Sequence, residues 1–241
     1  MLYTYESRVR YSEVDEYANM TLFSLVNNLQ DACTFHGVDA GVGLDYNTER
    51  RRAWIIANIQ SCFLRYPRFG EKILVTTWAS GFHGMIAKRL FQMHTADGEL
   101  LCEAATEWLF MDLDTRMPVR IPEDQVAAYG LEERPLTREQ GKRKIRVPDV
   151  GEELEPFRIQ EHHLDTNKHV NNAQYIRLAQ RYLPLGFTVE QMRVEFKQQA
   201  LLDDPDIPRY TKEDEEKYFV VLRNEHGEDY FVAEFAGTEK A

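Results

Sequence analysis

Two stretches of the chain, 22–36 and 173–183, carry apolar residues at intervals of three or four positions. This spacing places the apolar side chains on one face of a helix, so each stretch predicts a helix that buries one side. The residues that define the two stripes are Leu22, Leu25, Val26, Leu29, Ala32, Cys33 and His36, followed by Ala173, Ile176, Ala179, Tyr182 and Leu183.

Each predicted helix is followed by segments rich in β-branched and aromatic residues, which are typical of strands. The first half contains WIIANIQSCFLRYP, EKILVTTWASGF and AKRLFQMHTADGELLCEAATEWLFMD, and the second contains MRVEFKQQALL, PRYTKE and YFVVLRNEHGEDYFVAEFAGT. ADGE at 96–99 and EHGE at 225–228 each lie between two strand-like runs, where glycine favours a tight hairpin turn. Antiparallel strands are therefore expected in both halves.

The two halves look like copies when residue 8 is written under residue 158 and the comparison continues without a gap. RVRYSEVDEYANMTLFSLVNN then pairs with RIQEHHLDTNKHVNNAQYIRL, which places Asp15 opposite Asp165. Because the order strand, helix and several strands occurs twice, we predict an α+β fold in which each half packs one long helix against an antiparallel sheet. Joining the two sheets edge to edge would cover strand edges that are otherwise exposed.

The repeat also predicts the domain organisation. The expected domains are residues 1–130 and 151–241, connected by a linker at 131–150 that contains Pro135 and Pro148. Between 134 and 146 this linker carries six basic residues and one acid, Glu139. A basic segment of this kind is either a solvated connection or a docking surface for an acidic partner.

The composition excludes several classes of protein. The chain of 241 residues is 43% hydrophobic and 29% charged, as in a folded globular protein, and its net charge of −11 argues against binding nucleic acid or anionic membranes. It has neither an apolar run of roughly 18 residues nor the pattern of a signal peptide, so we expect a cytoplasmic protein without membrane insertion. The widely spaced Cys33, Cys62 and Cys102 are expected to be buried thiols.

The segment LDTNKHVNNAQY, 164–175, concentrates polar chemistry at the start of the second helix: Asp165, Asn167 and His169 occupy alternate positions. The first copy reads VDEYANMTLF and keeps only the aspartate, with Tyr17 and Asn19 opposite the other two. Helix capping alone would not explain this asymmetry, because several residue types cap equally well. One working site, in the second half, is therefore predicted.

A metal site is a less satisfactory interpretation of the same segment. His162, His163, Asp165 and His169 do not follow a known zinc spacing, and neighbouring histidines in a strand point to opposite faces. We expect neither a metal nor another cofactor.

The same segment resembles the active-site segment of a known family, the acyl-acyl carrier protein (acyl-ACP) thioesterases, in its bacterial type. AWIIANI, RYPRFGE and WLFMDLDTRMPVRIPEDQV in the first half are also similar to segments of this family, and the matches run in order from about residue 5 to residue 235. The residues that fit the pattern D-x-N-x-H-V-N-N-x-x-Y are Asp165, Asn167, His169, Val170, Asn171, Asn172 and Tyr175.

The resemblance implies a fold and an activity. The fold would be two tandem hot-dog domains, each a helix wrapped by an antiparallel sheet, with the acyl pocket in the first domain. The activity would be hydrolysis of fatty acyl-ACP to free fatty acid and carrier protein, which ends fatty acid synthesis. Two large side chains of the first half, Trp54 and Met85, are candidates for limiting the acyl chain length.

The resemblance also implies catalytic roles for Asp165, Asn167 and His169. Either Asp165 or His169 would activate water, while Asn167 would orient the partner or the thioester carbonyl. An imidazole changes charge near neutral pH, where a general base is most effective, but the sequence does not decide between the two. Backbone N–H groups ahead of the helix would stabilise the developing oxyanion.

One position departs from the family pattern. VEFKQQA, 194–200, aligns with L-E-Y-R-R-E-C, so the family glutamate falls on Gln199 and the cysteine on Ala200. A cysteine nucleophile at that place is excluded, whereas Gln199 can position a water or donate to an oxyanion. Glu195 would lie on the same strand face as Gln199 but about 13 Å away, too far to replace the missing carboxylate.

The expected partner is the acyl carrier protein, which is acidic and carries its acyl chain on a phosphopantetheine arm. An acidic enzyme needs a basic patch to meet it, because like charges oppose encounter. Two alternatives stay open, an acyl-CoA thioesterase and a non-catalytic acyl-binding module, and the oligomeric state, a homodimer included, is also open. The candidate docking residues are Arg50, Arg51, Arg52, Arg143 and Lys144.

Overall fold

A computed structural model describes residues 1–239. The chain divides into two compact units. The first contains Met1–Ala57 and Ser61–Gln140, and the second contains Asn58–Gln60 and the chain from Gly141 onward. Each unit is described by itself below.

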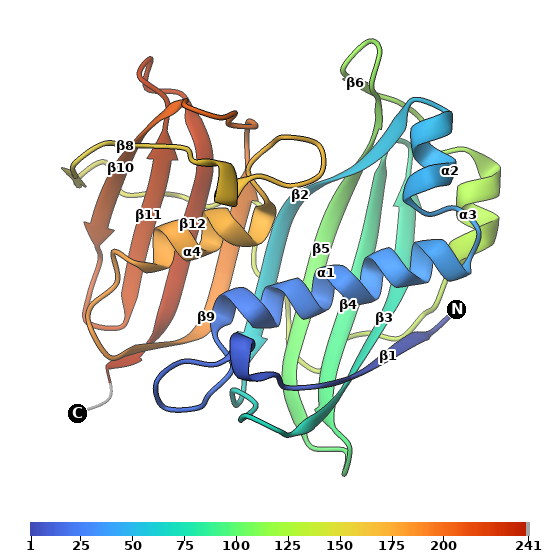
Figure 1. The fold of residues 1–241 in the computed structure, drawn as a ribbon, viewed down its shortest axis with the longest axis horizontal. Coiled ribbons are helices and arrows are strands. Elements are labelled where there is room, and N and C mark those ends of the chain that lie inside the picture. The colour runs from blue at the N-terminus through green and yellow to red at the C-terminus, as the bar shows by residue number, and fades with distance from the viewer. Residues whose placement is uncertain (240–241) are drawn as a thin grey trace. The chain divides into compact units, whose positions relative to one another are not determined.

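The first unit packs one long helix on a sheet (Figure 1). Its strands follow the order β1, β3, β4, β5, β2, and β1 to β5 along this path pair antiparallel, with β6 added to β5. The elements are β1 (Tyr3–Arg8), η1 (Tyr11–Glu13), α1 (Leu22–Asp39), α2 (Leu44–Glu49), β2 (Arg52–Phe63), β3 (Lys72–His83), β4 (Ile86–Thr95), β5 (Leu100–Asp112), β6 (Met117–Pro118) and α3 (Glu123–Tyr129).

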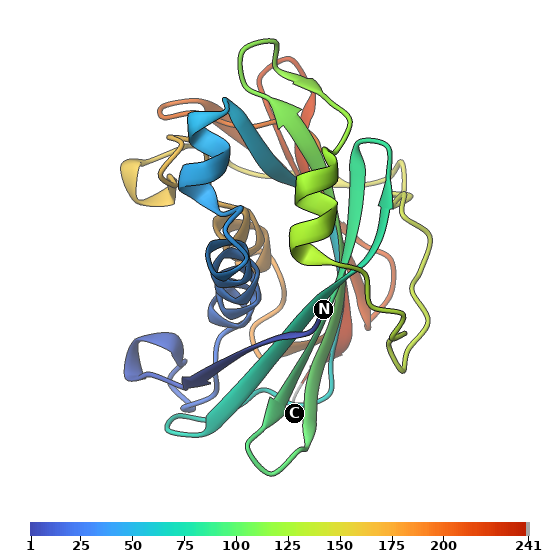
Figure 2. The same ribbon diagram turned by 90° about the vertical axis from the view of Figure 1, so that its right-hand side faces the viewer.

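Helix α1 begins where its sequence provides a cap. The Thr21 hydroxyl accepts a hydrogen bond from the backbone N–H of Ser24 at 3.2 Å, a contact of the kind that stabilises a helix by about 1 kcal/mol. The predicted stripe faces the sheet: Leu25 and Leu29 are buried, and each contributes about 1.5–3 kcal/mol by leaving water. Figure 2 shows α1 nearly end-on, lying against one face of the sheet.

The second unit repeats this arrangement with a shorter helix. Its sheet order is β9, β12, β11, β10, β7, with β8 paired to β10, and all of these pairs are antiparallel. Helix α4 packs against β11 and β12, over a core that includes Tyr218, Phe231 and Phe235. The elements are β7 (Glu152–Glu153), β8 (Phe157–Arg158), η2 (Glu161–His163), α4 (Asn172–Gln180), β9 (Phe187–Phe196), β10 (Pro205–Lys212), β11 (Lys217–Arg223) and β12 (Asp229–Glu239).

These observations confirm the predicted α+β fold and both hairpins. Gly98 and Gly227 lie in the two hairpin turns with φ of 90° and 78°, a conformation that glycine adopts without steric cost. Two boundaries were wrong. The second helix ends at Gln180, and the strand predicted from MRVEFKQQALL begins earlier, at Phe187, and ends at Phe196.

The segment 131–150 has no regular secondary structure but is fixed in both units. In the first unit, the Glu103 carboxylate accepts hydrogen bonds from the Thr137 N–H at 3.0 Å and hydroxyl at 2.7 Å. In the second, Ile145 is buried in a cluster with Phe219, Val221 and Val232. The division between the units falls within this segment, after Gln140. Among the helices of residues 1–239, none has the length and apolar character that crossing a membrane requires.

Candidate active site

Three of the predicted catalytic residues, Asp165, Asn167 and His169, lie in a tight loop between η2 and α4. Leu164 and Val170 form an antiparallel bridge at its base, and the Asp165 N–H donates to the His169 carbonyl at 2.8 Å. The Asp165 Oδ1 atom accepts hydrogen bonds from the N–H groups of Asn167 at 2.7 Å and His169 at 3.2 Å. One carboxylate therefore stabilises the loop through two backbone N–H groups. Asn167 is exposed and His169 is half-buried.

The loop leads directly into the N-terminus of α4. The Asn171 side chain caps this helix by accepting from the Ala173 N–H at 2.8 Å. The first N–H groups of a helix point away from it and carry partial positive charge. An oxygen that becomes negative beside this end would be stabilised.

Two hydrogen bonds hold the segment that carries Gln199 against the loop and helix α4. The Val170 N–H donates to the Ala200 carbonyl at 3.1 Å, and the Ala200 N–H donates to the Tyr175 hydroxyl at 2.8 Å. Gln199, adjacent to Ala200, is exposed. The structure therefore gathers Asn167, His169 and Gln199 on neighbouring segments of the second unit.

Tyr175 is the residue of this region whose role the sequence did not reveal. Its ring is 2% exposed and stacks on Phe231 with the centroids 5.5 Å apart. Burial raises the pKa of the phenol, so the hydroxyl keeps its proton while its oxygen accepts from Ala200. The tyrosine at the end of the motif was the available signal, but its partner 25 residues away was not visible.

We expected Glu195 and Gln199 to lie on one strand, and this prediction was wrong. Strand β9 ends at Phe196, because the chain turns there to reach Ala200. The Glu195 carboxylate instead accepts a hydrogen bond from the Ile145 N–H and forms an ion pair with Lys197. Its two oxygens are thus held in other contacts.

The two candidate pocket residues both approach Phe110 in the first unit. The Trp54 ring lies 4.8 Å from the Phe110 ring, and its indole N–H donates to Gln125 at 3.1 Å. Met85 lies at the turn between β3 and β4, where its carbonyl accepts from the Phe110 N–H at 3.0 Å, and it is 42% exposed. A role for either side chain in acyl binding stays a prediction.

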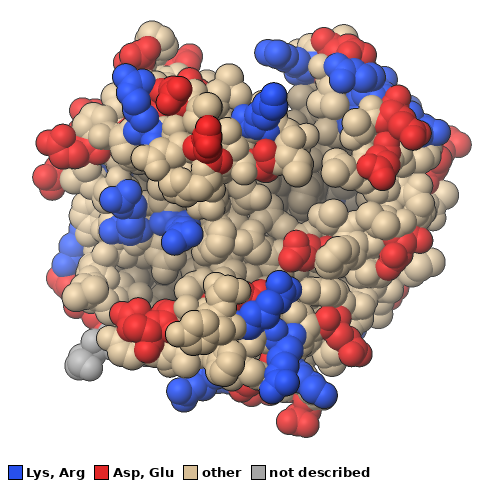
Figure 3. Space-filling model, in the orientation of Figure 1, with Lys and Arg blue, Asp and Glu red and all other residues tan. Residues whose placement is uncertain are grey.

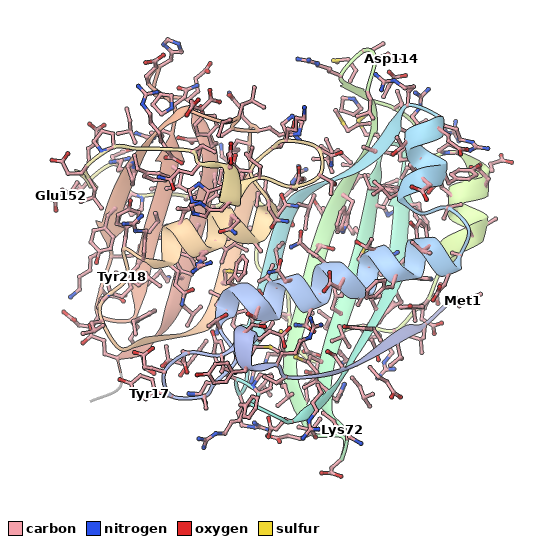
Figure 4. All side chains as sticks on the ribbon, viewed as in Figure 1. Met1, Tyr17, Lys72, Asp114, Glu152 and Tyr218 are labelled. Atoms are coloured by element: carbon pink, nitrogen blue, oxygen red, sulfur yellow. The ribbon has the colours of Figure 1, made fainter. Side chains whose placement is uncertain are left out.

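The arginine run at 50–52 is already paired with acidic residues. Arg51 contacts Asp114 at 2.9 Å, and Arg52 contacts Asp112 at 2.8 Å. Asp114 is labelled in Figure 4, at the turn between β5 and β6. Arg50 lies over the Tyr46 ring at 3.6 Å and 3.8 Å from Glu49. These pairs reduce the positive charge that the run offers to a partner.

Charges of both signs are interspersed on the face shown in Figure 3. Arg143 and Lys144 are exposed in the second unit, and their segment is held by Arg193, whose guanidinium donates to the Lys142 and Lys144 carbonyls.

The three cysteines are free thiols. Among residues 1–239, no three His, Cys, Asp or Glu side chains are grouped as metal ligands would be.

Both halves of the chain match domains of one known family. Residues 1–129 match the acyl-ACP thioesterase N-terminal domain, and residues 148–234 match the acyl-ACP thioesterase C-terminal domain. The chain belongs to the acyl-ACP thioesterase family. This result confirms the resemblance inferred from the sequence.

A curated relative agrees with this membership. The chloroplastic palmitoyl-acyl carrier protein thioesterase of Gossypium hirsutum is 26% identical over 73% of this chain and 46% of its own. The chain spans about half the length of the curated relatives it matches.

Among solved structures, an acyl-ACP thioesterase from Bacteroides thetaiotaomicron is similar with a TM-score of 0.89 at 20% identity, and the match covers 98% of this chain and 97% of the Bacteroides chain. The 12:0-ACP thioesterase from Umbellularia californica is similar with a TM-score of 0.88 at 17% identity, and the match covers 99% of this chain and 98% of the Umbellularia chain. At these identities the likeness establishes the fold, which confirms the expected hot-dog type.

Proposed function

We propose that this member of the family hydrolyses the thioester of fatty acyl-ACP and releases free fatty acid and carrier protein, ending fatty acid synthesis. The observation that supports the proposal is that the loop carrying Asn167 and His169 leads into α4 and is hydrogen-bonded, through Val170, to the segment that carries Gln199. None of the three side chains forms a hydrogen bond within the described residues, so each is available to a substrate or water.

His169 is the base in this proposal. Its imidazole takes a proton from water, the water oxygen bonds to the thioester carbonyl carbon, and the carbonyl oxygen becomes negative. When this tetrahedral species collapses, the carbon–sulfur bond breaks and the imidazolium returns the proton to the departing sulfur. The products are a carboxylic acid and the pantetheine thiol. General acid–base help of this kind is worth about 10² to 10⁴ in rate.

Asn167 and Gln199 supply polar contacts that differ in purpose. The Asn167 amide can donate to the oxygen that becomes negative, together with the first N–H groups of α4, and losing one such donor slows turnover by about 10² to 10³. Gln199 cannot take a proton, but its amide can hold the attacking water beside His169. No step requires a metal or a cofactor.

The test is the release of free fatty acid from palmitoyl-ACP and octanoyl-ACP. We expect turnover by the wild type and a fall of at least about 10² in kcat for His169→Ala. Asn19→Ala changes the equivalent position of the first copy and is the matched control, for which kcat should not change. Binding of acyl-ACP without turnover by the wild type would contradict the proposal and favour an acyl-binding module.

The substrate and the compartment are parts of the same proposal. Comparing palmitoyl-ACP with palmitoyl-CoA at equal concentrations distinguishes a carrier-protein enzyme from an acyl-CoA thioesterase, and we expect a higher kcat/KM for the carrier substrate. A cytoplasmic location is supported by the three free cysteines, since thiols persist in reducing compartments.

A further inference from the structure

The first unit contains a copy of the site loop without its catalytic side chains, and this copy is an internal control. The loop between η1 and α1, on which Tyr17 is labelled in Figure 4, corresponds to the loop between η2 and α4 at an offset of 150 residues. A contact found in both loops serves the fold, because only one loop carries the histidine.

The aspartate makes the same contacts in both loops. The Asp15 Oδ1 atom accepts hydrogen bonds from the N–H groups of Tyr17 and Asn19, both at 2.9 Å. The Asp15 N–H donates to the Asn19 carbonyl at 2.9 Å, and Val14 bridges to Met20. These contacts match those of Asp165, bond for bond.

The backbone conformation is shared as well. Ala18, which precedes Asn19, and Lys168, which precedes His169, both have a φ of 63°. A non-glycine residue rarely adopts this left-handed conformation, so other contacts must hold it in place. In both loops the aspartate oxygen holds the N–H groups on either side of this residue.

The flanking contacts are repeated too. The N–H at 10 donates to Glu13 at 2.7 Å, and the N–H at 160 donates to the imidazole Nδ1 of His163 at 3.1 Å. Burial lowers the pKa of His163, which favours the neutral imidazole that can accept this bond. Thr21 and Asn171 cap the following helices. His163 is therefore part of the scaffold.

The two loops differ in what they present to solvent. Tyr17 and Asn19 stand where the second loop has Asn167 and His169. Tyr17 is 71% exposed, so the corresponding position of the second loop is an outward-facing one. At these two positions the second loop carries an amide and an imidazole that a substrate can meet.

We infer that Asp165 is a positioning residue, whose carboxylate shapes the loop that presents Asn167 and His169 and takes no proton during hydrolysis. The inference rests on the proposed function and assigns proton transfer to His169 alone. The Oδ1 atom of Asp165 already accepts the N–H groups of Asn167 and His169, so its visible contacts are those that hold the loop.

The experiment compares two substitutions at each aspartate. Asn at 165 keeps a side-chain oxygen that can accept both N–H groups but has no basicity, whereas Ala removes the acceptor. We expect Asp165→Asn to keep kcat for palmitoyl-ACP within about tenfold of the wild type, and Asp165→Ala to lower kcat by at least about 10², with KM less affected. Asp15→Asn and Asp15→Ala are the matched controls in the loop without a histidine.

The outcomes separate this inference from the proposed function. An inactive wild type contradicts the proposed function. An active wild type with Asp165→Asn as slow as Asp165→Ala overturns the positioning role and makes Asp165 the base. Equal, near-wild-type kcat for both Asp165 variants also overturns it. Asp15→Ala measures what losing these two bonds does to stability and should leave kcat unchanged, so a folding defect is recognised as such.

Discussion

The backbone N–H of Ala200 donates a hydrogen bond to the buried phenol oxygen of Tyr175 at 2.8 Å. This bond joins helix α4, which follows the site loop, to the segment that carries Gln199. Together with the bond from Val170 to the Ala200 carbonyl, it fixes where Gln199 stands relative to His169. The position of Gln199 therefore depends on Tyr175, which does not itself face solvent.

Replacing Tyr175 by Phe should test this dependence. The change keeps the ring on Phe231 but leaves the Ala200 N–H without its acceptor, at a cost of about 1–3 kcal/mol in stability. We expect kcat to fall as well. In a Gln199→Ala background the same change should lower kcat no further, because the group it positions is gone.

The control for this cycle is Tyr218→Phe, at the buried tyrosine labelled in Figure 4, whose hydroxyl donates to the Glu215 carbonyl at 3.3 Å. It should lower stability without changing kcat. Additive effects of Tyr175→Phe and Gln199→Ala on kcat would show that Tyr175 supports the fold only.

Gln199→Glu restores the residue type of the family pattern. A carboxylate at this position could accept the water proton directly, so we expect kcat to rise by about tenfold or more and the acidic limb of the pH–rate profile to move to lower pH. Gln199→Ala is the matched variant and should be slower than the wild type. A glutamate variant no faster than the alanine variant would mean that the site is built around an amide at this position.

The sequence predicted the elements of the site well because their signals are local. Helical periodicity located the helix that follows Asp165, and the offset of 150 residues identified its copy at Asp15. Helix and hairpin signals extend over a few residues, and each depends on side-chain spacing that can be read directly.

The contacts between elements could not be predicted in this way. Arg51 meets Asp114 because β2 and the turn after β5 lie at the same end of the first sheet, and no spacing in the sequence encodes that pairing. The end of β9 at Phe196 is set by the bonds that draw Ala200 to the loop, while the sequence continues with residues that a strand tolerates. The role of Asp165 became visible only when its bonds could be compared with those of Asp15.

A buried carboxyl makes the second unit sensitive to pH. Asp206, in β10, is fully buried, and neither of its oxygens forms a hydrogen bond within the described residues. Burial raises its pKa from 3.8 to about 7. Because the folded state holds this proton more tightly than the unfolded chain does, Asp206 contributes most to stability below pH 4, and that contribution is lost as the pH rises to about 7.

Asp206→Asn should remove this loss. The amide has a similar shape and no charge, so the variant should be more stable than the wild type at pH 8, by up to about 4 kcal/mol, with the difference shrinking towards pH 4. Urea unfolding at pH 4.5, 6 and 8 measures the effect, with exposed Asp203→Asn as the control. A stability difference that is the same at all three values would mean that Asp206 does not carry the titration.

Charge reversal at the basic segment tests the carrier-protein partner. Arg143 and Lys144 are exposed and lie in a segment whose basic residues outnumber its acids, so this segment can attract an acidic protein. We expect Arg143→Glu with Lys144→Glu to raise KM for acyl-ACP several-fold at low salt, with the effect shrinking as salt screens the charges. Hydrolysis of a short thioester analogue should be unchanged, since it does not need the carrier.

Arg68→Glu with Lys72→Glu makes the same change in net charge on exposed residues of the first unit and is the matched control. An equal rise of KM in both double variants would assign the effect to net charge, and no rise in either would remove this segment as the docking surface.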